Sequence, residues 1–135
     1  MKRYVWIILA IGLLIALTGC GASHTQEREE SPVEFTVVGI RDVPVELTDI
    51  IEENKKNEIR MTYTDEESLY LVRGYGEQKT GGYSIAVKSC TEDEETIWLD
   101  TQLLGPKNQE EISKDPSYPC LVIQMEKREK EVMIQ

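Results

Sequence analysis

Short runs of alternating apolar and polar residues fill most of the chain from residue 58 onward, and this pattern restricts the possible folds most. Successive side chains of a β-strand point to opposite faces of a sheet, so such runs predict strands with one buried face. Ile59, Met61 and Tyr63 alternate in this way with polar neighbours. The expected strands cover residues 35–39, 59–64, 69–73, 83–88, 97–103 and 120–125, with a short edge strand at 132–134.

One segment has helical rather than strand periodicity. Pro44 stands where a helix can begin, and Leu47, Ile50 and Ile51 share one face at helical spacing. Lysines and an asparagine follow, as is typical of a closing turn. We therefore expect one helix over residues 44–56, and its narrow apolar stripe indicates that it packs on one face of a sheet.

The order of these elements predicts an α+β fold that is mainly antiparallel β. About six short strands follow one another through tight turns, which favours a small sandwich or a partly open barrel with one helix packed on it. A parallel sheet would need more crossover helices than the pattern provides.

The amino-terminal residues have the features of a bacterial lipoprotein leader. Lys2 and Arg3 precede an apolar run, Val5 to Leu17, that is short for a membrane span. The run closes on Leu-Thr-Gly-Cys20, which resembles the lipobox, where cleavage precedes a cysteine that receives a diacylglyceryl group; an ordinary secretory cleavage site is the alternative.

These features divide the chain into three parts. Residues 1–19 are expected to be a signal peptide, residues 20–33 a lipidated flexible tether, and residues 34–135 a single domain. The acyl chains on Cys20 would hold the protein at the cell membrane, on its extracytoplasmic face.

Composition argues against several kinds of function. The formal net charge of −10 becomes −12 once Lys2 and Arg3 are removed, and no basic patch remains for nucleic acid. The single histidine, His24, lies in the tether, so the domain lacks the base of a Ser-His-Asp triad and any histidine ligand for zinc. We expect no catalytic residues, no cofactor and no metal, and interpret the acidic residues 92–95 as a solvated turn rather than a calcium site.

Two cysteines remain if Cys20 is acylated. Cys90 and Cys120 fall at strand positions that we expect on the same, less buried face of adjacent strands, where a disulfide is geometrically possible. Two unpaired thiols that act as small apolar side chains are the favoured alternative.

A glycine-rich stretch, Gly76-Glu77-Gln78-Lys79-Thr80-Gly81-Gly82-Tyr83-Ser84-Ile85, separates two expected strands, and Ser117-Tyr118-Pro119 precedes the last long one. No helix follows the glycines, so they do not form a dinucleotide-binding motif. Together the two motifs resemble the C-terminal domain of the protease complex subunit PrcB family, over roughly residues 69 to 125. Cys120 departs from the family pattern, which has an aromatic residue there.

The resemblance implies a non-catalytic lipoprotein that associates with a secreted protease and stabilises it. Glycines allow close approach of another chain, and tyrosines supply stiff side chains with a polar tip. A hairpin turn with Tyr83 packed in the core explains the same residues without a partner. Tyr75 and Tyr118 are the residues that we most expect at the contact. The full set of expected contact residues is Tyr75, Gly76, Glu77, Thr80, Gly81, Gly82, Tyr83, Tyr118 and Pro119.

Two other functions stay open at this point. The stretch from Thr80 to Tyr83 is similar to the Thr-Thr-Gly-Tyr loop of chagasin-type cysteine protease inhibitors, which are also small β-sandwiches. A direct protease inhibitor is therefore one alternative. A structural or ligand-sensing lipoprotein of the cell envelope is the other.

Overall fold

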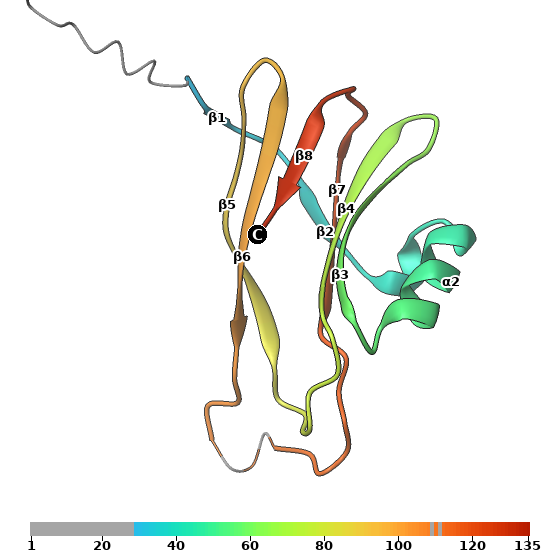
Figure 1. The fold of residues 1–135 in the computed structure, drawn as a ribbon, viewed down its shortest axis with the longest axis vertical. Helices are drawn as coiled ribbons and strands as arrows, with labels where there is room; N and C mark the ends of the chain where they lie inside the picture. The colour runs from blue at the N-terminus through green and yellow to red at the C-terminus, as the bar shows by residue number, and fades with distance from the viewer. Residues whose placement is uncertain (1–28, 109, 111) are drawn as a thin grey trace, which may run out of the picture.

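The computed structural model describes residues 29–108, 110 and 112–135. These residues form two four-stranded sheets that face each other as a sandwich, with one α-helix on the outer face of one sheet (Figure 1). The predicted fold class, mainly antiparallel β with one helix, is confirmed, and the sheets form a sandwich rather than a closed barrel. The predicted leader, Cys20 and most of the tether lie outside the described residues.

The strands divide between the sheets in a mixed order. One sheet, which we call the β5–β6 sheet, has the order β1-β5-β6-β8, and the other, the β4–β7 sheet, has the order β2-β7-β4-β3. Every strand pair is antiparallel except β6 with β8, which is parallel. The strands are β1 (Ser31–Pro32), β2 (Thr36–Val38), β3 (Glu58–Thr64), β4 (Ser68–Tyr75), β5 (Ser84–Glu92), β6 (Thr96–Leu104), β7 (Cys120–Glu126) and β8 (Glu131–Ile134); a short 3-10 helix, η1 (Ile40–Asp42), precedes the helix α2 (Val45–Asn54).

Two separate hydrophobic clusters stabilise these layers. Between the sheets, Leu71, Ile97 and Ile123 are completely buried. On the outer face of the β4–β7 sheet, Leu47 and Ile51 of α2 pack against the sheet. The central strands β4 and β7 are therefore covered on both faces, which explains why their apolar residues run consecutively rather than in strict alternation.

The amino-terminal boundary of the folded domain differs from the sequence prediction. Ser31 and Pro32 pair with Glu92 and Thr91 of β5, and Val33 is buried between the sheets. The ordered structure thus includes residues that we assigned to the tether before residue 34. A two-residue strand that contains proline is too short for any periodicity to be visible.

Two smaller differences concern element ends. The helix covers Val45–Asn54 with Pro44 as its N-cap, two residues shorter at its carboxyl end than predicted. Strand β5 continues through Thr91 and Glu92, which we expected in the following turn. Each shift is small because the turn signals there are spread over several polar residues.

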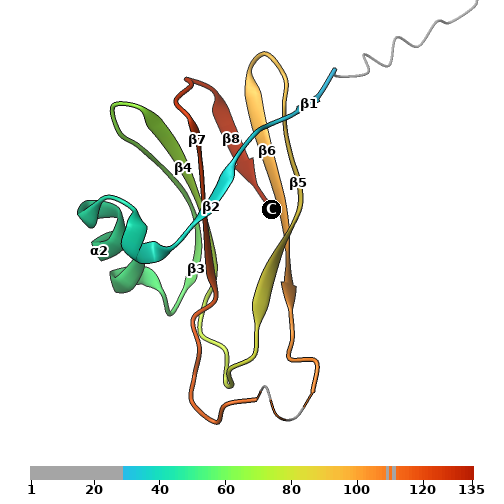
Figure 2. The same ribbon diagram turned by 180° about the vertical axis from the view of Figure 1, so that it is seen from behind.

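The sandwich has two distinct ends. The first described residues and the turns β3–β4, β5–β6 and β7–β8 lie together at one end, which we call the N-terminal end (Figures 1 and 2). The connections β4–β5 and β6–β7 lie at the opposite end, which we call the loop end.

Candidate functional site

Two long loops form the loop end. Residues 76–83, which we call the glycine loop, connect β4 to β5, and residues 105–119, the covering loop, connect β6 to β7. Each connection passes from one sheet to the other, so the two loops close the same end of the sandwich and lie beside each other (Figures 1 and 2).

Hydrogen bonds join the two loops into one unit. The backbone of Gln78 exchanges two hydrogen bonds with that of Ser117, at 2.8 and 3.0 Å. The Gly81 amide donates to the Ser113 carbonyl at 3.1 Å, and the Ser117 hydroxyl donates to the Thr80 carbonyl at 2.6 Å. The backbone of the glycine loop is therefore held in place by the covering loop.

The glycines serve this packing. Gly76 has a φ of +74°, and a Cβ there would lie 3.1 Å from the carbonyl oxygen of Lys56, at the end of the helical segment. A Cβ on Gly81 would lie 2.9 Å from the Cβ of Ser113. Gly82 has a φ of +86°. Backbone geometry and close approach thus account for three of the nine residues that we expected at a partner contact.

Tyr75 lies at the end of β4 and joins the two sheets. Its hydroxyl is 2.6 Å from Oγ1 of Thr101 on β6, and that Thr101 hydroxyl donates to the Gln135 carbonyl at 2.9 Å. The Tyr75 hydroxyl is therefore the donor to Thr101. The guanidinium of Arg73 stacks on the ring, 3.8 Å from its centroid. We expected Tyr75 at a partner contact; in the structure it is half-buried and its hydroxyl joins the two sheets.

Arg73 is the residue near this site that the sequence analysis missed. Its side chain is only 4% exposed, and Nη1 donates to the Gly74 carbonyl at 2.7 Å. Nε has no hydrogen-bond partner among the described residues. Arg73 shares its strand face with Leu69 and Leu71, so the period of two could have placed it between the sheets.

Tyr118 and Glu77 remain at the margin of the loop unit. The Tyr118 hydroxyl donates to Oε1 of Glu77 at 3.2 Å, and Nζ of Lys55 lies 4.9 Å from the centre of the Tyr118 ring. The hydrogen bond from Lys55 to Glu52 raises the pKa of that lysine. Glu77 is exposed and Tyr118 is half-buried, so both offer atoms to a partner.

Tyr83, Pro119 and Thr80 are half-buried. Tyr83 has the inward parity that we expected, and its ring lies 3.9 Å from the Cβ position of Gly105. It lines a small open crevice together with Pro119. The charged residues in the sequence of the two loops nearly balance, with Lys79, Lys107 and Lys114 against Glu77, Glu110, Glu111 and Asp115.

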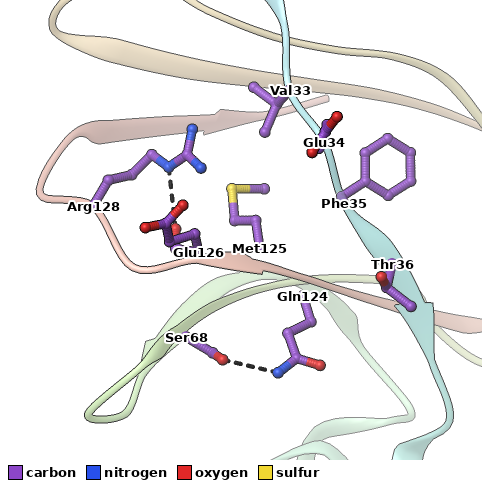
Figure 3. A pocket seen from close by; sticks show the side chains of 9 residues that line it. All are labelled: Val33, Glu34, Phe35, Thr36, Ser68, Gln124, Met125, Glu126 and Arg128. Carbon is purple, nitrogen blue, oxygen red and sulfur yellow. Dashed lines mark hydrogen bonds between the residues drawn. The ribbon is translucent and has the colours of Figure 1, made fainter.

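A larger crevice lies at the other end of the molecule. It has a volume of about 820 Å³ and opens where residues 33–36 cross from one sheet to the other (Figure 3). Within it, the Gln124 amide donates to the Ser68 hydroxyl at 2.8 Å, and Nε of Arg128 donates to the Glu126 carbonyl at 3.1 Å. The Ser68 hydroxyl therefore has an amide rather than a base as its neighbour, and the lining does not form a nucleophile–base pair.

Two other features are absent from the part of the chain that the structure describes. No group of three or more histidine, cysteine or acidic side chains there has the arrangement of a metal site. No helix in residues 29–108, 110 and 112–135 is long and apolar enough to span a bilayer.

The two cysteines lie in different clusters. Cys90 is buried between the sheets, and Cys120 packs against the cluster beneath α2, so the expectation that they share one face is wrong. Both are free thiols, as the favoured alternative predicted. Burial raises the pKa of Cys90 and raises that of Cys120 to about 11, so both are poor nucleophiles at neutral pH.

Comparison with known protein families gives a match. The family model described as PrcB C-terminal matches residues 69–126, which contain β4 from its second residue, β5, β6, β7 and both loops of the loop end. No curated protein and no solved structure matched the chain. The match confirms the resemblance that the two motifs indicated, and it suggests a family of protease complex subunits. Over this segment the chain is similar to the PrcB C-terminal family.

Proposed function

We propose that this protein is a non-catalytic, lipid-anchored extracytoplasmic subunit that binds a partner protein, a secreted protease, through its loop end and stabilises it. The family supports association with a protease complex. The leader-like residues and Cys20 support the anchor.

The observation that carries the binding proposal is the double linkage of the glycine loop to the covering loop. Four hydrogen bonds fix Gln78, Thr80 and Gly81 against Ser113 and Ser117. A surface that is already ordered before binding loses little conformational entropy on association. The family match contains both loops in full.

The same linkage favours a stabilising subunit over a chagasin-type inhibitor. An inhibitory loop must project so that it can enter a protease cleft. Here the Thr80 carbonyl and the Gly81 amide are both occupied by the covering loop. The glycine loop therefore contributes to a broad composite surface rather than a free projecting tip.

Affinity capture from the native cell surface tests the proposal. We expect the tagged full chain to retain an active protease, and the captured protease to lose activity more slowly on heating than the free enzyme. A stoichiometric fall in protease activity would instead indicate an inhibitor. Recovery of no protease would refute the partner class.

A single substitution tests the position of the contact. Tyr118→Ala should weaken capture by about 1–2 kcal/mol, because aromatic side chains dominate protein interfaces. Glu66→Ala, in the β3–β4 turn at the opposite end, is the matched control and should capture normally. Equal yields from both variants would remove Tyr118 from the interface.

Metabolic labelling with a fatty acid tests the anchor. We expect the native chain to be labelled and the Cys20→Ala variant to lose the label.

A further inference from the structure

One edge of the sandwich is only half closed. Strand β1 pairs with β5 at Thr91 and Glu92, and the Val33 amide donates to the Cys90 carbonyl at 3.0 Å. The chain then crosses to the other sheet, where β2 pairs with residues 122–124 of β7 (Figures 1 and 2). Along residues 84–89, no described strand pairs with the outer edge of β5.

This open edge carries free backbone groups. The Leu99 carbonyl of β6 accepts a hydrogen bond from the Gln135 amide on the β8 side, away from β5. Backbone amide and carbonyl groups point to alternate sides along a strand. Those of Thr101 and Leu103 therefore also point away from β5. Their register partners Val87 and Ile85 therefore direct their amide and carbonyl groups outward.

A crevice lies beside this edge. It has a volume of about 220 Å³ and is lined by Tyr83, Ser84 and Ile85 at the start of β5 and by Pro119, Cys120 and Leu121 at the start of β7. Residues 120 and 121 of β7 likewise lie beyond the end of β2. The open half of the edge thus combines an unpaired strand with a depression of about the volume of one large side chain.

We propose that the edge of β5 at residues 84–87 binds an extended segment of the partner protein as an added strand, with one apolar side chain of that segment in the crevice. The inference rests on the proposed function and names its mode of recognition. The edge already accepts an extended segment of this chain, β1, just above the open part. Strand addition gives affinity through backbone bonds and specificity through side-chain pockets.

The observations favour a segment of a partner protein, rather than a segment of this same chain, as the strand that pairs with the edge of β5. If a second copy paired through its own β5, its inward side chains would remain in its own core and leave the crevice empty. The segment between Cys20 and Pro32 is polar and offers no large apolar side chain. A free extended segment with an apolar residue satisfies both the edge and the crevice.

A bulge limits the length of the added strand. The register of β5 with β6 shifts between Val87 and Ser89. Such a bulge, with Lys88 beside it, disfavours pairing further along the edge. The outward side chains below the bulge, Ser84 and Ala86, are small.

The experiment uses a display library of random linear peptides, selected against the full chain in detergent. We expect enriched peptides to contain an apolar residue and to slow hydrogen exchange at the Ile85 and Val87 amides. The Ala86 amide, which faces β6, should be slow to exchange before and after binding. Protection elsewhere, or no enrichment, would overturn the proposal.

Two matched variants sharpen this test. Ile85→Lys adds a charge at the crevice, whereas Ala86→Lys adds the same charge one residue away on the outer face. Binding of the selected peptides should weaken roughly tenfold or more in the first variant, through loss of an apolar contact, and little in the second. Equal affinities would refute the role of the crevice. Because the peptides replace the protease, their binding succeeds or fails independently of protease capture.

Discussion

At the scale of single residues, Gly76 is held by two independent constraints. Its φ of +74° is a conformation that residues with a Cβ rarely adopt, and the Lys56 carbonyl lies 3.1 Å from the Cβ position. The Glu77 amide also donates to that carbonyl, at 3.1 Å, so the backbone cannot withdraw without losing a hydrogen bond. Gly76 therefore couples the loop end to the turn after α2.

We predict that Gly76→Ala destabilises the fold by more than about 1 kcal/mol, because alanine is strained at positive φ.

Gly81→Ala is the informative comparison. The new methyl group would meet the Ser113 side chain at 2.9 Å and push the covering loop outward, without forcing a positive φ. It should reduce protease capture more than it reduces the free energy of unfolding. Chemical denaturation and capture yield, measured together, check both statements; a stable Gly76→Ala variant would contradict the first.

Glu92 is the centre of a partly buried ion cluster at the N-terminal end. Nη1 of Arg128 donates to both of its carboxylate oxygens at 2.7 Å, and Nζ of Lys130 donates at 3.2 Å. The hydrogen bond from Arg128 is the main cause that lowers the pKa of Glu92. A lowered pKa in the folded state means that this stabilisation is present above the pKa of the unfolded chain, about 4.3.

We predict that Glu92→Gln lowers the free energy of unfolding by about 1–3 kcal/mol at neutral pH, since charged hydrogen bonds are lost. The difference from the native protein should shrink as the pH falls through the folded pKa of Glu92, where the native carboxylate becomes protonated. Urea unfolding at several pH values measures this. If the difference in free energy of unfolding between the two proteins did not change with pH, the charge of Glu92 would not be the source of the stabilisation. Glu67→Gln, exposed in a turn, is the control.

Residue roles could be predicted only where the periodicity of the strands determines them. The period of two correctly placed Ile85 and Val87 inward, and it could have placed Arg73 there. It gave no indication that the Tyr75 hydroxyl reaches Thr101, because that contact joins two sheets whose order the local pattern does not encode. The local pattern also does not show which strands share a sheet, so the prediction that Cys90 and Cys120 lie on one face was wrong.

At the scale of elements, polar contacts as well as apolar packing join the two sheets near the loop end. Tyr75 of β4, Thr101 of β6 and Gln135 after β8 form a chain of hydrogen bonds across the sandwich. Arg73 covers the Tyr75 ring from the same strand. Hydrogen bonds in such partly buried positions are directional, so they fix how the sheets lie relative to each other.

We predict that Tyr75→Phe costs about 0.5–1.5 kcal/mol of stability, because it removes the hydroxyl and leaves the ring in place. Tyr118→Phe removes the longer bond, 3.2 Å, to the exposed Glu77 and should cost less. Thermal or urea unfolding of the two variants checks the order. If Tyr118→Phe were the more damaging, the covering loop rather than the sheet contact would limit stability.

Most elements could be predicted because each long strand has either an alternating pattern or, in β4 and β7, a short apolar run, and because polar residues mark the turns. Strand β1 could not, since two residues show no period. The pairing of β6 with β8 in parallel could not either, because a four-residue strand leaves its direction open. The short β1 also explains the open edge of β5, because a longer β1 would have paired with more of that strand.

At the scale of the whole molecule, charge is distributed unevenly along the long axis. The turns at the N-terminal end contain acidic residues at 65–67 and 93–95, whereas in the β7–β8 segment Glu126, Glu129 and Glu131 are balanced by Lys127, Arg128 and Lys130. The loop end has nearly balanced charges. Under the proposed anchoring through Cys20, the acidic end is the one nearest the membrane. An anionic surface would then repel the near end of the domain and direct the loop end outward.

This arrangement predicts an orientation that depends on lipid charge and on salt. In the acylated chain on vesicles, a fluorophore at Lys79 should be quenched less by headgroup acceptors than one at Glu66, because position 79 lies at the far end. Adding anionic lipid should reduce quenching at Glu66 further. Raising the salt concentration should reverse that change, since at about 0.1 M the screening length is only about 10 Å. Equal quenching at both positions would mean that the domain lies on its side, and the loop end would then not be presented to a partner in the surrounding medium.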